Sequence, residues 1–125
     1  MAKRARTHST ARDYPRTARL NRLFQEILGD ELERIDDERL ELLTITGVDT
    51  DADLGRAIVY YDTLGGEDDD VEVLEGLAEV RQKLQSAIAR QTRVKRTPEL
   101  VFRPDDVVRG AVRIDEVLRE LHRDD

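Results

Sequence analysis

The strongest constraint on the fold is a change of hydrophobic period near the middle of the chain. Over residues 40–50 and again over 54–63, apolar residues alternate with polar or small ones, and the second segment contains the run Ala-Ile-Val-Tyr-Tyr. A period of two residues is typical of β-strands. Only a short polar link, Asp49 to Asp53, joins the two segments. The sequence therefore predicts an antiparallel hairpin.

The sequence on either side of the hairpin follows the helical period. From Pro15 onward, one face of a predicted helix is apolar, made by Leu20, Leu23, Phe24, Ile27 and Leu28. A second apolar face runs from Val71 to Ile88 and predicts either one long helix or two helices joined by a kink. The acidic run Glu67 to Asp70 precedes it, and we expect these side chains to cap the helix N-terminus.

The last part of the chain predicts a third strand and a final helix. The strand covers residues 99–103, with the sequence Glu-Leu-Val-Phe-Arg, and ends at Pro104. The helix covers residues 112–121 and is amphipathic. We expect its apolar side chains to point inward; these are Ile114, Val117, Leu118 and Leu121.

The predicted order is α-β-β-α-α-β followed by a C-terminal helix. This is an α+β fold in which helices cover one side of a three-stranded sheet. A chain of 125 residues suits a single domain. We expect a flexible basic arm over 1–14, a folded domain over 15–121 and a tail over 122–125. The expected core consists of Leu23, Phe24, Ile27, Leu43, Ile45, Val59, Leu77, Leu84, Ile88, Leu100 and Phe102.

The composition argues against a disulfide-bonded, membrane-spanning or secreted protein. The chain has no cysteine, which excludes disulfides and thiolate metal sites. No apolar run approaches the ~20 residues that a membrane span needs. The basic N-terminal segment 1–17 lacks the apolar stretch of a signal peptide. We therefore expect a cytoplasmic protein with no membrane partner.

The net charge of −7 is unevenly distributed along the chain. Residues 1–25 carry seven basic residues and one acid, and residues 81–103 carry the same numbers, so each block has a net charge of +6. Residues 26–80 carry three arginines and nineteen acids, a net charge of −16. Binding depends on local potential more than on total charge. The sequence therefore predicts one basic face and one acidic face.

The basic residues are the best candidates for a binding site, because lysine and arginine neutralise nucleic-acid phosphates. The alternative is that they only solvate the outer faces of helices. Against this alternative, only Asp13 and Glu99 interrupt the two basic blocks. The predicted RNA-binding residues are Arg12, Arg16, Arg19, Arg22, Arg81, Lys83, Arg90, Arg93, Lys95 and Arg96.

The sequence also contains partial motifs for metal binding and catalysis, but their residues do not have the spacing or neighbours that these activities need. The acidic link that begins at Asp49 resembles a calcium loop, but Leu54 stands where the loop needs glycine and Tyr60 where it needs glutamate. His8 and His122 lie in the terminal segments, away from any carboxylate and serine pair typical of a triad. We therefore expect no metal, no cofactor and no enzymatic activity.

Four motifs follow one another along residues 14–121. They are Arg16-x-x-Arg19-x-x-x-x-Phe24-x-x-Ile27-Leu28, then Leu43-Thr44-Ile45-Thr46-Gly47-Val48-Asp49 leading to Asp53-Leu54-Gly55-Arg56-Ala57-Ile58-Val59-Tyr60, then Thr97-Pro98-Glu99-Leu100-x-Phe102, and finally Arg113-Ile114 with Val117-Leu118. In this order they resemble the ribosome-binding factor A family, bacterial assembly factors of the small ribosomal subunit.

The resemblance implies a KH domain of the second type, with the order α-β-β-α-α-β. Ordinary KH domains clamp a nucleic-acid strand with a Gly-x-x-Gly loop between the two middle helices. The family lacks that loop and bends the helix at an Ala-x-Gly sequence. The corresponding position here is Val80-Arg81-Gln82, which contains neither alanine nor glycine.

The resemblance also implies a function. Members of the family are non-enzymatic factors that bind the small (30S) subunit and 16S rRNA during late maturation and pre-rRNA processing, and they matter most in the cold. We expect a monomer that needs no cofactor. The alternative is a protein-interaction module that docks its acidic face on a basic ribosomal protein.

Overall fold

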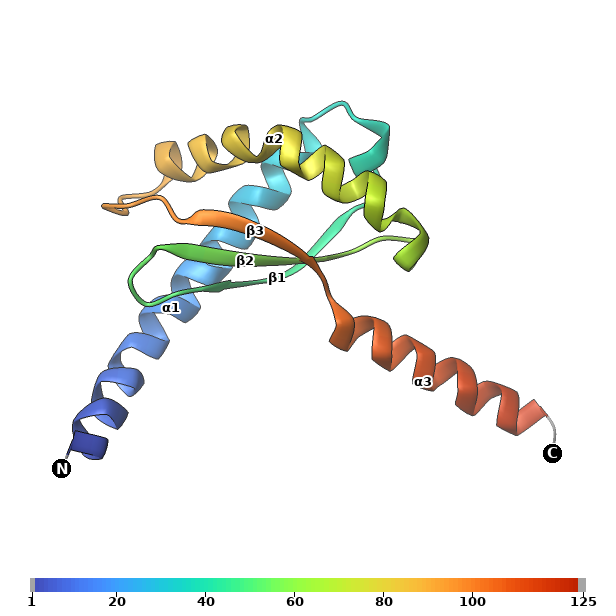
Figure 1. Ribbon diagram of the computed structural model, residues 1–125, viewed down its shortest axis with the longest axis horizontal. Coiled ribbons are helices and arrows are strands. Elements are labelled where there is room, and N and C mark those ends of the chain that lie inside the picture. Colours follow the sequence, from blue (N-terminus) through green and yellow to red (C-terminus); the bar gives the residue numbers. More distant parts are fainter. Residues whose placement is uncertain (1, 124–125) are drawn as a thin grey trace.

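The computed structural model describes the backbone of residues 2–123 and the side chains of residues 17–111 and 113–122. Figure 1 shows the arrangement of the elements. In chain order they are α1 (Ala2–Glu33), the 3-10 helix η1 (Glu38–Leu40), β1 (Thr44–Thr50), β2 (Arg56–Asp62), the 3-10 helix η2 (Gly66–Asp69), α2 (Asp70–Gln91), β3 (Glu99–Pro104) and α3 (Asp106–Arg123).

The three strands form one mixed sheet in the order β1-β2-β3. The pairing of β1 with β2 is antiparallel, which confirms the predicted hairpin, and β3 joins β2 in parallel. A β-bulge interrupts β1 between Ile45 and Gly47. At the bulge, the Thr46 hydroxyl donates to Oδ2 of Asp105 at 2.5 Å. The bulge therefore ties β1 to the start of α3.

Helices α1 and α2 pack on one face of the sheet and enclose the core. Most residues of the predicted core are buried or packed against it, since alternate strand residues and one helix face point to the same layer. Leu23 is the exception, with 38% of its surface exposed. The fully buried side chains of largest volume are Tyr61, Phe24, Leu28, Leu77, Leu84, Ile88, Leu100, Val59, Val73 and Pro98.

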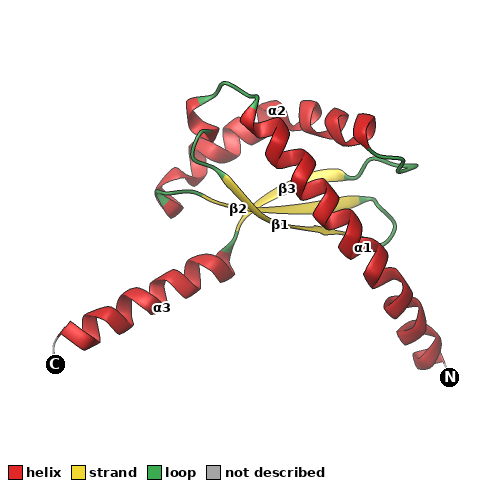
Figure 2. Ribbon diagram, turned by 180° about the vertical axis from the view of Figure 1, so that it is seen from behind, coloured by secondary structure: helices red, strands yellow, loops and turns green. Residues whose placement is uncertain are grey.

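The predicted order α-β-β-α-α-β has two middle helices, but the structure has one, α2, over the whole region where the period allows one or two. It continues without a break through Val80-Arg81-Gln82, although both views show the ribbon changing direction along its length (Figures 1 and 2). The acidic run lies at the start of the helix as predicted, with Asp69 at the N-cap and Asp70 in the first turn, but the expected side-chain capping bond does not form. Asp69 stands at the N-cap without a side-chain capping bond and accepts instead from the Gly65 amide at 2.9 Å.

The start of α1 differs from the prediction. The helical backbone begins at Ala2, whereas the sequence places the start at Pro15. Periodicity detects helices that pack an apolar face, and residues 2–14 have none. Alanine and arginine nevertheless favour the helix by intrinsic propensity. The mobility of the basic arm stays a prediction, and Met1 and the last two residues of the predicted tail lie outside the described residues.

The inward orientation predicted for the last helix is wrong. Helix α3 leaves the end of β3 and projects away from the body of the molecule (Figures 1 and 2). Its apolar face is exposed, at 62% for Ile114 and 58% for Leu121. An amphipathic pattern identifies which face of a helix is apolar, but it does not say whether the same chain covers that face.

Candidate RNA-binding surface

Three segments meet at one end of the sheet. The amide of Glu99, at the start of β3, donates to the Gly55 carbonyl in the turn between β1 and β2 at 3.1 Å. Helix α1 reaches the same end, because Thr50 at the end of β1 donates its amide to Oδ1 of Asn21 at 2.9 Å. We call the surface formed by residues 19–22, 51–56 and 90–99 the basic end.

The basic end collects cations from both basic blocks of the sequence. The middle of α1 supplies one group and the last turn of α2 with its connection to β3 supplies the other (Figure 1). These side chains are all exposed: Arg19, Arg22, Arg90, Arg93, Lys95 and Arg96. Two segments far apart in the sequence therefore contact the same end of the sheet, α1 through Asn21 and Thr50 and the α2–β3 connection through Glu99 and Gly55.

The remaining predicted residues are placed differently. Lys83 is exposed one to two turns earlier on α2. Arg81 is partly buried and lies 3.7 Å from the carboxylate of Glu99. Arg12 and Arg16 belong to α1 by their backbone, but their side chains lie outside the described residues.

The prediction missed one cation and several features of the turn at this end. Arg56 begins β2 beside Asp51, with Nε 3.9 Å from Oδ2. Oδ1 of Asp53 accepts from the Gly55 amide at 2.9 Å, and Leu54 adopts a positive φ of 60°. The hairpin prediction could have placed Arg56 here, because the first residue of the second strand follows the turn directly. Asp51 and Asp53 bring negative charge to the same end.

Most other carboxylates of the acidic segment lie at the far end of the sheet. The connection from α1 to β1 and the start of α2 carry the acidic runs 36–38 and 67–70 (Figure 1). The strand β1 separates them from the turn, since this connection enters at Thr44 and the turn follows Thr50. Most carboxylates of the acidic segment are therefore separated from the basic end along the sheet, although Asp51 and Asp53 lie within it, and the two-face arrangement stays a prediction.

A buried ion cluster holds the base of α3. Arg109 is 9% exposed, and its guanidinium binds Asp62 at 3.0 Å and Asp70 at 2.7 and 2.9 Å. The hydroxyl of Tyr61 donates to Oδ1 of Asp70 at 2.9 Å. The bonds from Arg109, with a smaller contribution from Tyr61, lower the pKa of Asp70 below its usual value. All members of this cluster are paired, so its role is structural.

Among the side chains that the structure describes, those of residues 17–111 and 113–122, no group of three or more His, Cys, Asp or Glu residues is arranged to hold a metal ion. No helix within residues 2–123 is long and apolar enough to cross a membrane.

Comparison with known proteins identifies relatives over most of the chain. The profile of the family described as Ribosome-binding factor A matches residues 16–118. A ribosome-binding factor A from Rubrobacter xylanophilus is 41% identical over 111 residues, which cover 88% of this chain and 90% of that protein. A second relative, from Levilactobacillus brevis, is 37% identical and covers 86% of this chain and 97% of its own.

The solved structures that resemble this fold carry the same name as the relatives found by sequence. The crystal structure of ribosome-binding factor A from Thermus thermophilus has a TM-score of 0.63 and 31% identity, over 70% of this chain and 93% of that chain. The Thermus thermophilus factor as fitted into a cryo-EM map of its 30S complex has a TM-score of 0.55 and 30% identity, over 66% and 87% of the two chains. The predicted α+β fold of KH-like type is confirmed. The chain belongs to the ribosome-binding factor A family.

Proposed function

We propose that this protein is a non-enzymatic, cytoplasmic assembly factor that binds 16S rRNA of the small ribosomal subunit during late maturation and pre-rRNA processing. The observation that carries the proposal is the convergence of exposed cations from α1 and from the end of α2 on the basic end. The 30S complex of the related Thermus thermophilus protein supports the same partner.

The chemistry of the basic end suits phosphate contacts. Arginine presents a planar fork of N–H donors to phosphate oxygens. Among the described residues, Arg90 and Arg93 have no ion-pair or hydrogen-bond partner, so both guanidinium groups are available. Phosphate contacts position a protein but carry little base information, so specificity would come from the shape of the folded RNA.

The form of α2 bears on how RNA would bind. An ordinary KH domain grips a strand with a loop between two helices. Here α2 is uninterrupted across the corresponding position. We therefore place the RNA contact on the end of α2 and on the α2–β3 connection. By occupying one conformation of the rRNA, the protein would shift the population toward that conformation without any covalent step.

The test is binding of the purified protein to small subunits, measured by co-sedimentation. The double variant Arg90→Gln with Arg93→Gln should bind at least about tenfold more weakly, as expected for the loss of two phosphate contacts. The matched control is Arg103→Gln with Arg119→Gln, which removes two exposed arginines away from the basic end. This control should bind within about twofold of the wild type.

The same experiment decides between RNA binding and docking through the acidic face. The variant Asp68→Asn with Glu72→Gln removes two exposed carboxylates near the start of α2. If this variant loses subunit binding while the Arg90 and Arg93 variant keeps it, the proposal is wrong and the acidic face is the contact. Thermal unfolding of every variant shows whether a loss of binding follows from a loss of folding.

A further inference from the structure

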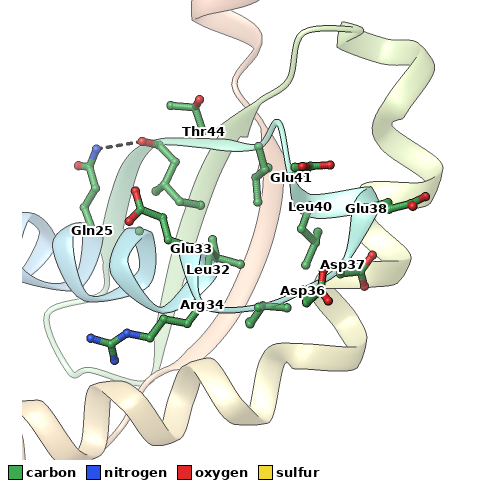
Figure 3. Close-up of a pocket in the computed structure, with 14 residues that line it drawn as sticks. Gln25, Leu32, Glu33, Arg34, Asp36, Asp37, Glu38, Leu40, Glu41 and Thr44 are labelled. Atoms are coloured by element: carbon green, nitrogen blue, oxygen red, sulfur yellow. Dashed lines mark hydrogen bonds between the residues drawn. The ribbon is translucent and has the colours of Figure 1, made fainter.

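An open groove lies at the end of the sheet opposite the basic end. It is formed by the last two turns of α1, the connection through η1 and the first residues of β1, and its volume is about 790 Å³ (Figure 3). At one side, Nε2 of Gln25 donates to the carbonyl of Ile45 at 3.1 Å and fixes α1 against β1. The groove is therefore a feature of the packed fold.

The floor of the groove is apolar. It consists of Leu32, Ile35, Leu40, Leu43 and Ile45, of which Leu32 and Leu40 are buried and the others are partly buried. Gly29 lies in the wall on α1, and a Cβ atom built there would meet no atom within 4 Å. The missing side chain leaves room for an apolar side chain of a partner.

The rim of the groove is acidic. Four of its carboxylates are exposed: Glu33, Asp36, Glu38 and Glu41. Among the described residues, no arginine, lysine or histidine lies within ion-pair distance of these four.

Arg34 lines the groove and Arg39 lies beside it, but neither pairs with the four exposed carboxylates of the rim. Arg34 lies 3.7 Å from Glu31 and is directed away from the other acids of the groove in Figure 3. Arg39 is held by Asp37 at 2.7 Å and by Glu79 at 2.5 Å. The rim therefore keeps an excess of negative charge beside an apolar floor.

We propose that this groove binds a lysine- and arginine-rich segment of a partner protein, with an apolar side chain on the floor and its cations facing the rim. The acidic rim repels RNA, and its charge is complementary to a basic peptide. The apolar floor favours a ligand with an apolar side chain over a simple polyvalent cation. The volume of the groove is in the range that accommodates a few side chains.

The placement of the groove adds to the function proposed above. The groove opens beside Thr44 at the start of β1, whereas the basic end follows Thr50 at the other end of the same strand. One molecule could therefore contact RNA at one end and a basic protein segment at the other. Both contacts could form at the same time.

The test uses the full-length protein and a fluorescein-labelled dodecapeptide of lysine and arginine with two leucines, with binding followed by fluorescence anisotropy. The variant Glu33→Gln, Glu38→Gln, Glu41→Gln should weaken binding at least about tenfold, because it removes the facing charges. The control Asp115→Asn, Glu116→Gln, Glu120→Gln removes three exposed carboxylates from α3. It should bind within about twofold of the wild type.

A second pair of variants changes the shape of the groove and leaves its charge unchanged. Gly29→Leu fills the wall and should weaken binding about fivefold, whereas Gly29→Ala gives a similar gain in helix propensity with little filling and should bind like the wild type. A peptide with both leucines replaced by serine should bind more weakly.

Three results would overturn the proposal. They are equal losses for the rim variant and the α3 control, equal affinities for Gly29→Leu and Gly29→Ala, or equal affinities for the two peptides. No ribosomal subunit is present in these measurements, so their failure would leave the proposed RNA contact untouched.

Discussion

The guanidinium of Arg109 holds both carboxylate oxygens of Asp70, with Nη1 2.7 Å from Oδ2 and Nη2 2.9 Å from Oδ1. The two residues stand 39 positions apart, Arg109 in the first turns of α3 and Asp70 at the first position of α2. The guanidinium also lies over the ring of Tyr61, 5.8 Å from its centroid. This contact sets the direction in which α3 leaves the sheet.

Removing the guanidinium of Arg109 should lower the free energy of unfolding. Arg109→Met leaves Asp62 and Asp70 partly buried without their partner, so the free energy of unfolding should fall by about 2–4 kcal/mol. The matched control is Arg113→Met, because the 2.6 Å ion pair of Arg113 with Glu67 is exposed. That variant should change stability by less than about 0.5 kcal/mol. Urea unfolding measures both, and equal stabilities of the two variants would contradict a structural role for Arg109.

The ion pair between Arg109 and Asp70 should make the free energy of unfolding depend on pH. The bonds from Arg109 lower the pKa of Asp70 in the folded state, so its contribution to stability is present above the unfolded value of about 3.9. The contribution is lost as the pH falls through the folded pKa. The difference in unfolding free energy between wild type and Asp70→Asn should therefore shrink as the pH is lowered from 6 toward 3. A difference that is constant across this range would rule out the linkage.

Thr50 offers a stabilising substitution. Its side chain is buried at the end of β1, and Oγ1 is the one buried side-chain polar atom without a hydrogen-bond partner among the residues that the structure describes. Thr50→Val keeps the β-branched shape and removes the unpaired hydroxyl, so the free energy of unfolding should rise by about 0.5–1 kcal/mol. Thermal unfolding checks this, and a lower melting temperature would show that the hydroxyl finds a partner in solution.

Binding to RNA should depend on salt. If the basic end neutralises roughly 5 phosphates, the logarithm of the binding constant should fall with the logarithm of salt concentration at a slope of about −3.5 to −4.5. Filter binding to 16S rRNA over a series of potassium chloride concentrations measures the slope. A slope near zero would contradict phosphate-driven binding.

The outer part of α3 should contribute little to folding. Leu118 and Leu121 are 48% and 58% exposed, so the double variant Leu118→Ala, Leu121→Ala should lose less than about 1 kcal/mol of stability. Leu84 is fully buried on α2, and Leu84→Ala should lose about 2–5 kcal/mol. If the double variant loses as much stability as Leu84→Ala, α3 packs against the body of the protein in solution.

Local patterns were sufficient for the hairpin and the core. The period of two residues over β2 puts Val59, which belongs to the predicted core, on one face of the strand, and Tyr61, which the prediction left out, lies on the same face. The helical period likewise places Phe24, Leu77 and Leu84 inside, because a helix face repeats on a fixed spacing. These are properties of neighbouring residues, and a sequence displays them directly.

The positions of the basic end and of the acidic groove depend on contacts between segments that are far apart in the sequence. The sequence predicted the cations at the end of α2, but their position at the same end of the sheet as Arg22 depends on how α1 lies beside β1. The sequence predicted an acidic face but not the groove within it, because the floor and rim of the groove are assembled from α1, η1 and β1 together.

By itself the sequence determined the strands, the apolar faces of the helices and the division of charge into blocks, since each depends on residues a few positions apart, although it misplaced the start of α1. Only the tertiary structure decided that α3 projects from the sheet, that Asp70 binds Arg109 while Asp69 makes no capping bond, and that the basic end and the acidic groove lie at opposite ends of the sheet. These outcomes depend on which distant segments come into contact, and that is set by the packing of the whole chain.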